Sequence, residues 1–294
     1  MLLLTLAALW GSSYLFIKVS LEDLSPAVIV WVRLALAAVV LLPVALARGA
    51  LAGVRGSLGV VVVLALIQVA APFMLITAGE LAISSSLAGV LVASAPIWTA
   101  ILAVWLDPEE RSRGWRLVGV AVGMAGVAFL LGVDTAGDAA ALLGGLGVVV
   151  ATIGYAVGGL TIKRRLGHLQ PLGLVTATMV ASALMTLPWA LLTAPSALPG
   201  TTTTLALLAL GIGGTGAAFV IFYVLIATVG PARASVVAYI APVFAVVYGV
   251  VLLDEPLTLG TVGGLALILG GSWLAAGGAA DRSGAPREAV ARPG

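Results

Sequence analysis

The sequence predicts an all-α membrane protein with ten transmembrane helices, arranged as two inverted five-helix repeats. Three observations predict this fold class. The chain of 294 residues is 62% hydrophobic and only 9% charged, whereas charged residues make up about a quarter of a typical soluble domain. Apolar runs long enough to cross about 30 Å of hydrocarbon recur from end to end. Residues of the first half also recur about 145 positions later in the second half.

The apolar runs define the spans, and the breaks between them are short and either polar or marked by Pro and Gly. We expect the first run to stay in the protein as a span, because no basic segment or convincing cleavage site marks it as a signal peptide. In chain order, the expected spans are 2–19, 27–47, 57–78, 85–106, 117–133, 142–162, 171–193, 204–226, 234–253 and 260–278.

The internal repeat places the same residue types at the same spacing. The only two lysines, Lys18 and Lys163, are 145 positions apart. The same spacing separates Pro26 from Pro171, Pro43 from Pro188, Glu110 from Glu255, Gly119 from Gly264 and Gly126 from Gly271, while Pro96 pairs with Pro242 after a one-residue slip. We therefore expect a first repeat over 1–133, a second over 142–278, and a disordered cytoplasmic tail over 279–294.

The placement of the cations predicts the topology. With the N-terminus inside, the outer loops hold no lysine or arginine, which is the bias expected of bacterial inner-membrane proteins. The inner segments then hold Arg48, Arg55, Arg111, Arg113, Arg116, Lys163, Arg164, Arg165, Arg233, Arg282, Arg287 and Arg292. Both termini are therefore predicted to be cytoplasmic.

Loop charges also predict that the two repeats are inverted, as an odd number of spans in each requires. The loop 107–116 carries three arginines, whereas its copy, 254–260, carries none. Conversely, the loop near Glu80 lacks cations, whereas its copy near Pro231 carries Arg233. Inverted repeats with a site between them are typical of alternating-access transporters.

Several function classes are disfavoured by what the sequence lacks. It has no cysteine, and its single histidine, His168, argues against a histidine-built metal site. We expect no metal, no cofactor and no nucleic-acid partner. No phosphate-binding loop for ATP is present. Serines and threonines without a neighbouring histidine or carboxylate disfavour an intramembrane enzyme, and nothing suggests the ringed pore of a channel.

No Asp, Glu or His falls inside an expected span, so the spans offer no residue for a proton relay. We therefore expect transport that follows the substrate gradient or otherwise needs no carboxylate.

The chain resembles the drug/metabolite transporter superfamily, specifically proteins with two EamA domains, and among them the YddG-type amino-acid exporters. The resemblance covers residues from about 5 to 278. Its opening pattern is the stretch 8–13, followed by Lys18, Pro26 and Arg33. Both repeats then end in a Pro-to-Glu-to-Gly pattern, which runs from Pro96 to Gly126 and from Pro242 to Gly271. The resemblance implies a central cavity formed by spans 3, 4, 8 and 9.

Aromatic and neutral polar residues in the spans are the candidates for substrate binding. Trp10 and its counterpart Tyr155 lie at mid-depth, where an aromatic ring can stack on a substrate or form a gate. Ordinary helix packing is the alternative. The repeat also departs from symmetry, since Tyr155 stands where the first copy has tryptophan and Thr178 stands where it has Arg33.

The remaining candidates share helix faces at turn spacing. Gln68 can bind both ends of an amino acid's backbone, although an interhelical hydrogen bond is the alternative and is slightly favoured. Plain packing is the alternative for the others. The full set of expected binding residues is Trp10, Ser13, Gln68, Pro72, Ser94, Trp98, Tyr155, Thr215, Phe219, Tyr223 and Tyr239.

Pro96 and Pro242 each remove a backbone donor within a span, and we expect them to act as a paired hinge. A static kink is the alternative. Glycines spaced as GxxxG, such as Gly119 and Gly123, indicate close helix packing.

Charged residues near the spans are expected to be structural. For Arg33 a structural role is favoured, and snorkelling toward Glu22 or Asp23 is the alternative. Glu110 and Glu255 are expected at interfaces or as helix caps.

Together these features predict an inner-membrane transporter that exports a small metabolite by alternating access and functions as a monomer in the lipid bilayer. An amino acid, aromatic or otherwise neutral, is the expected substrate, and cationic drugs or nucleoside- or sugar-type metabolites are the alternatives.

Overall fold

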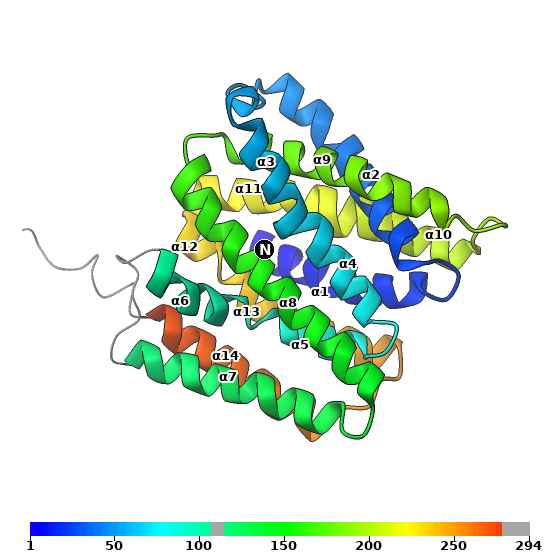
Figure 1. Cartoon of the computed structure of the whole chain (residues 1–294), viewed down its shortest axis with the longest axis vertical. Coiled ribbons are helices and arrows are strands. Elements are labelled where there is room, and N and C mark those ends of the chain that lie inside the picture. Colours follow the sequence, from blue (N-terminus) through cyan, green and yellow to red (C-terminus); the bar gives the residue numbers. More distant parts are fainter. Residues whose placement is uncertain (107–114, 278–294) are drawn as a thin grey trace, which may run out of the picture.

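The computed structural model describes residues 1–106 and 115–277, and the regular structure of these residues is helical throughout (Figure 1). Nine helical segments in these ranges are apolar and at least 18 residues long, which is enough to cross a bilayer. A tenth apolar helix, Val237–Leu252, is shorter at 16 residues. The predicted all-helical membrane fold is therefore confirmed. The predicted tail, 279–294, and Glu110 lie outside the described residues.

The helices follow the predicted spans in order. They are α1 (Leu2–Ser20), α2 (Pro26–Ala47), α3 (Leu58–Leu64), α4 (Ala71–Gly79), α5 (Ser85–Val92), α6 (Ala95–Leu106), α7 (Trp115–Asp134), α8 (Ala139–Thr161), α9 (Pro171–Leu192), α10 (Thr201–Leu208), α11 (Ala218–Val229), α12 (Pro231–Ala234), α13 (Val237–Leu252) and α14 (Leu259–Gly277). A 3₁₀ turn, Val54–Ser57, precedes α3, and a π-helical turn, Ile162–Leu166, extends α8.

Local signals explain where several spans begin. The side chains of Ser25, Ser84 and Asp138 accept a hydrogen bond from an amide in the first turn of α2, α5 and α8, respectively. Such N-caps satisfy donors that have no partner within the helix. Pro26 and Pro171 occupy the first positions of α2 and α9, where a missing N–H costs nothing.

Helical geometry changes inside the spans that surround the centre. π-helical segments join α3 to α4 (Ala65–Ala70) and α10 to α11 (Ala209–Ala217), which are counterpart positions of the two halves. Such segments are frequent at functional sites. The fourth span breaks between α5 and α6 just before Pro96, whereas Pro242 stays inside α13. The two prolines of the expected hinge therefore lie in different backbone surroundings.

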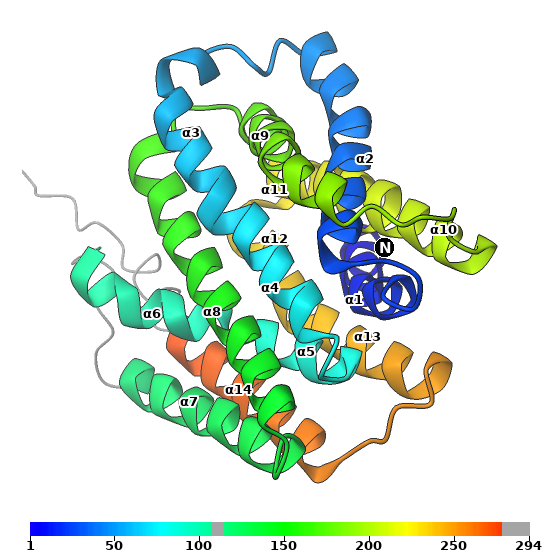
Figure 2. The same cartoon turned by 45° about the vertical axis from the view of Figure 1, so that its right-hand side comes forward.

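Three pairs of counterpart helices pack directly on each other: α2 on α9, α5 on α13 and α7 on α14 (Figures 1 and 2). Glycine allows the closest of these approaches, since a Cβ added at Gly271 would overlap the backbone of Gly123. The helices α4 and α8 also run side by side, and Gly79 meets Gly144 where they approach (Figure 2).

Loops gather at two ends of the helical bundle. We call one end the acidic face, because its loops, 20–25, 80–84, 134–138 and 253–258, carry Glu22, Asp23, Glu80, Asp134, Asp138, Asp254 and Glu255. We call the other end the arginine face. It comprises the loops 48–57 and 163–170, the starts of α7 and α9, and the segment 230–236, and it carries Arg48, Arg55, Arg116, Lys163, Arg164, Arg165 and Arg233.

Hydrogen bonds tie the segments of the acidic face together. Asp23 accepts bonds from the Thr203 hydroxyl at 2.6 Å and the Gly200 amide at 3.0 Å, and these donors lower the pKa of its carboxyl. Glu255 accepts bonds from the amides of Ser85 at 2.7 Å and Ser86 at 3.0 Å. The expected capping role of Glu255 is therefore confirmed, and its partner is the start of α5 in the other half of the chain.

Candidate functional site

A cavity of about 910 Å³ lies at the centre of the bundle and is lined by residues from all ten spans. The lining reaches the arginine face at Arg116, Gly167, Pro171 and Ser235. At the other end, none of the described residues in the loops of the acidic face contributes to it. The cavity is therefore open toward the arginine face and closed toward the acidic face.

The cavity brings together most of the binding residues expected from the sequence. Seven of the eleven line it: Trp10, Ser13, Gln68, Tyr155, Phe219, Tyr223 and Tyr239. Both expected hinge residues, Pro96 and Pro242, line it as well. Substrate binding itself stays a prediction for each of these side chains.

The other four lie outside the lining. The Trp98 indole donates to the Ser94 hydroxyl at 3.2 Å, and that hydroxyl donates to the Leu91 carbonyl at 2.6 Å, so both are tied to the break in the fourth span. Pro72 is buried at the start of α4. Thr215 is fully buried and contacts a lining residue, Arg33.

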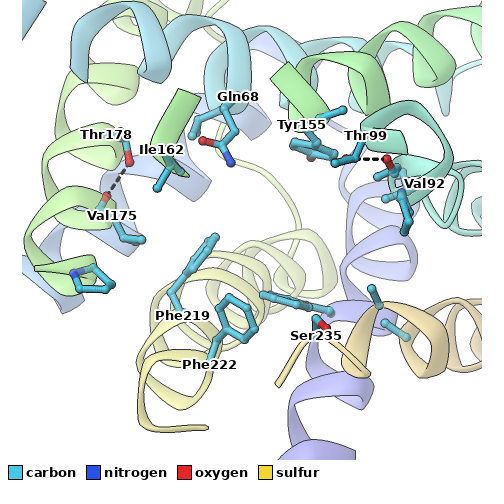
Figure 3. A pocket seen from close by; sticks show the side chains of 18 of the residues that line it. Gln68, Val92, Thr99, Tyr155, Ile162, Val175, Thr178, Phe219, Phe222 and Ser235 are labelled. Carbon is cyan, nitrogen blue, oxygen red and sulfur yellow. Dashed lines mark hydrogen bonds between the residues drawn. The ribbon is translucent and has the colours of Figure 1, made fainter. Parts of the chain in front are cut away.

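Aromatic rings form one wall of the cavity. The Trp10 ring lies 5.1 Å from the Phe222 ring and 6.0 Å from the Phe219 ring, measured between centroids. In Figure 3, Phe219 and Phe222 face the cavity from one side, and Gln68 and Tyr155 face it from the opposite side. Such rings offer apolar faces and edges to a flat ligand and can attract a cation.

Arg33 supplies a positive charge to the cavity lining. Its side chain is only 8% exposed. Its Nε donates to the Thr215 hydroxyl at 2.8 Å, and its guanidinium lies 3.9 Å from the centroid of the Phe73 ring. Its other guanidinium nitrogens form no hydrogen bond with the described residues. A guanidinium held on one side and open on the other is suited to a carboxylate, which it can bind through two parallel hydrogen bonds.

This placement overturns one alternative for Arg33. Its side chain does not snorkel toward Glu22 or Asp23, because it turns into the bundle, where Thr215 and Phe73 hold it. Asp23 is already engaged by the start of α10.

Gln68 lies in the π-helical segment Ala65–Ala70, opposite the aromatic wall (Figure 3). Its amide forms no hydrogen bond with any described residue in this structure, which does not support the alternative of an interhelical bond. The helix α8 leaves room for this side chain at Gly158, where an added Cβ would lie 2.6 Å from Gln68 Cδ. Both the donor and the acceptor of this amide are therefore available to a ligand.

The charged side chains in the described cavity lining are all positive. Arg33 and Arg116 line the cavity, and the described lining includes no aspartate or glutamate. Moving a cation into a partly dry, positively charged cavity is unfavourable, whereas an anionic group gains a partner there. Elsewhere in the described residues, no group of three or more His, Cys, Asp or Glu side chains is placed to hold a metal ion.

Sequence reasoning missed three residues. Tyr14 lines the cavity one turn beyond Trp10, and their spacing on one helix face was a signal for it. Phe222 adjoins the expected Tyr223. Glu80 follows the last residue of its span, as expected, but it is 0% exposed. The absence of acids from the spans therefore does not mean that the bundle lacks a buried carboxylate.

Comparisons with known proteins identify similar chains. The model of the EamA-like transporter family matches residues 1–132 and again residues 142–277. The chain is 24% identical over 276 residues to the uncharacterized transporter YoaV of Bacillus subtilis, covering 92% of this chain and 94% of that protein. It is 29% identical over 269 residues to the uncharacterized inner membrane transporter YedA of Escherichia coli K12, covering 87% and 83%.

An uncharacterized transporter of Archaeoglobus fulgidus is 30% identical over 267 residues, which covers 90% of this chain and 94% of that protein. A solved crystal structure of a protein superposes with a TM-score of 0.68 at 23% identity, covering 97% of this chain and 98% of the other. That likeness concerns the fold alone.

Proposed function

This chain belongs to the EamA-like transporter family, and from that premise we propose that it exports amino acids, aromatic or otherwise neutral, across the inner membrane by alternating access. The matched family and the transporters it resembles support the general class. The substrate is inferred from the cavity.

The observation that carries the substrate proposal is the open guanidinium of Arg33. The carboxylate of an amino acid pairs with this guanidinium. The Gln68 amide oxygen and the faces of Trp10 and Phe222 receive the ammonium group. An aromatic or apolar side chain of the substrate then packs on the remaining wall.

Cationic drugs are the alternative substrate, and the lining disfavours them. The described lining offers arginines and no carboxylate to pair with a permanent cation. The aromatic rings alone would have to offset the repulsion between the cation and the arginines and the cation's loss of hydration.

In the proposed cycle, the cavity opens alternately to the arginine face and to the acidic face. With both termini cytoplasmic, the open arginine face is the cytoplasmic one, and the cavity loads substrate from inside. The pairing of α2 with α9, α5 with α13 and α7 with α14 supports two inverted repeats related by a twofold axis. Opening the acidic face requires the contact between Glu255 and the start of α5 to separate.

A ligand panel tests the substrate proposal on the purified protein. At a concentration of phenylalanine about 100 times its Kd, we expect stabilisation of about 2.7 kcal/mol, which raises the unfolding temperature by roughly 5 °C. Phenethylamine, which lacks the carboxylate, should raise the unfolding temperature little. 3-Phenylpropionate, which lacks the ammonium group, should raise it by an intermediate amount. Stabilisation by tetraphenylphosphonium but by none of the tested amino acids would move the assignment to cationic drugs.

A further inference from the structure

Glu80 is a buried carboxylate outside the substrate cavity. It follows Gly79, the last residue of α4, and its side chain is 0% exposed. Both of its carboxylate oxygens are buried without a hydrogen-bond partner in the described part of the chain. A carboxylate that is ionised in such a place lacks both water and donors, which is strongly unfavourable.

The nearest cation, Lys18, is engaged elsewhere. Its ammonium donates to two backbone carbonyls, those of Glu80 at 2.6 Å and Ile83 at 2.8 Å, and not to the Glu80 side chain. This arrangement satisfies carbonyls at the end of α4, as a basic side chain often does at a helix C-terminus. Lys18 therefore joins α1 to this corner without neutralising the carboxylate through a direct contact.

The other titratable groups around Glu80 come from the elements packed against it. Tyr14 lies one turn before Lys18 on α1, and its phenol is electrostatically coupled to Glu80. Arg33 on α2 acts at longer range, and its Nε is bound to Thr215. Glu255 adds a like charge from the loop before α14, and it is held by the start of α5. From α8, the residues that meet Gly79 are Gly144 and Val148, which carry no charge.

These surroundings favour the neutral form of the acid. Burial raises the pKa of the Glu80 carboxyl well above its ordinary value, and the ammonium of Lys18 opposes that shift only in part. The Glu255 carboxylate adds to the rise, because two neighbouring negative charges repel each other.

We propose that Glu80 is a proton-binding site that couples the opening of the acidic face to pH. When this face is closed, as here, the carboxyl carries a proton. When the face opens, water reaches the carboxyl, which ionises and releases one proton to the solution on that side. Closing the face takes one proton up again from the same solution, so atoms and charge balance over the two steps.

Two consequences follow from this site. A low pH at the acidic face favours the closed state seen here, and a high pH favours opening. If one proton is taken up on closing, the ratio of open to closed molecules changes by up to about tenfold for each pH unit. The expectation that transport needs no carboxylate stays a prediction, and Glu80 is the residue on which it can be tested.

Infrared spectroscopy tests the protonation directly and needs no substrate. In the full-length protein, we expect a C=O band of a protonated carboxylic acid to persist at neutral pH and to vanish in Glu80→Gln. The matched control, Glu22→Gln, changes an exposed carboxylate on the same face and should keep the band. A band that is missing in the wild type, or that is unchanged in Glu80→Gln, would overturn the proposal.

A distance measurement tests the coupling to the face. The chain has no cysteine, so spin labels can be placed at the exposed positions Ala82 and Leu257, which flank the contact between Glu255 and α5. In the labelled protein without further substitution, the population with the longer distance between the two labels should increase as the pH rises. In Glu80→Gln, which imitates the neutral acid, the shorter distance should persist at every pH. A wild-type distribution that ignores pH, or the same pH response in both proteins, contradicts the proposal even if the variant folds poorly in other assays.

Discussion

Replacing Arg33 with glutamine is expected to weaken phenylalanine binding about 10- to 100-fold and to abolish measurable transport. The substitution removes the charge that we propose pairs with the substrate carboxylate. A hydrogen bond to a charged group contributes about 1.5–3 kcal/mol, and about 1.4 kcal/mol corresponds to a factor of ten in affinity. Glutamine can still reach the Thr215 hydroxyl, so the buried threonine keeps a polar neighbour.

The comparison ligand separates a binding role of Arg33 from a structural one. Phenethylamine lacks the carboxylate and is itself a cation, so Arg33→Gln removes a repulsion and its weak binding should stay the same or become stronger. Arg33→Lys keeps the charge but loses the planar fork, and an intermediate affinity is expected. Arg55→Gln removes an exposed charge at the arginine face and should bind as the wild type does. Equal losses for phenylalanine and phenethylamine would assign Arg33 to the fold, and no loss for either would remove it from the site.

Gly271→Val is expected to destabilise the helical bundle. In α14, Gly271 faces α7 so closely that even a Cβ would overlap the backbone of Gly123, and it would lie 2.6 Å from the Gly119 carbonyl oxygen. The two helices must therefore separate. Overpacking of this kind costs about 1–3 kcal/mol or more, which lowers the unfolding temperature in detergent by roughly 3–10 °C.

The neighbouring glycine supplies the matched control. Gly270 is exposed on the same helix, and a Cβ added there would meet nothing within 4 Å. Gly270→Val changes helix propensity and side-chain size in the same way but should leave the contact of α7 with α14 intact. Equal destabilisation by both variants would show that the close approach contributes nothing.

The spans were predictable from the sequence because the membrane imposes a length and a polarity on each of them. The helix starts at Ser25 and Ser84, which are N-caps, and at Pro26 and Pro171 are also marked by local sequence signals. The cavity residues Trp10 and Tyr155 could also be predicted from the sequence, because counterpart positions of a repeat occupy equivalent places.

What the sequence could not reveal depends on contacts between distant segments. The direction of the Arg33 side chain is set by Thr215, 182 positions away. Glu80 is fully buried, and on the same face Glu255 caps a helix that begins 170 positions earlier in the chain. Such contacts leave no periodic pattern in the residues around either partner. The π-helical segments are equally hidden, since their sequences, such as Ala65–Ala70, are ordinary apolar stretches.

Counterflow is the sharpest test of whether the cavity carries an amino acid alternately between the two faces. Vesicles that contain the purified protein are loaded with unlabelled phenylalanine and diluted into a trace of labelled phenylalanine. If the cavity opens alternately to the two faces, the loaded vesicles should transiently accumulate labelled phenylalanine above its equilibrium level. Vesicles with Arg33→Gln should not. Uptake that only equilibrates, at the same rate in loaded and empty vesicles, would show that the protein does not carry phenylalanine by alternating access.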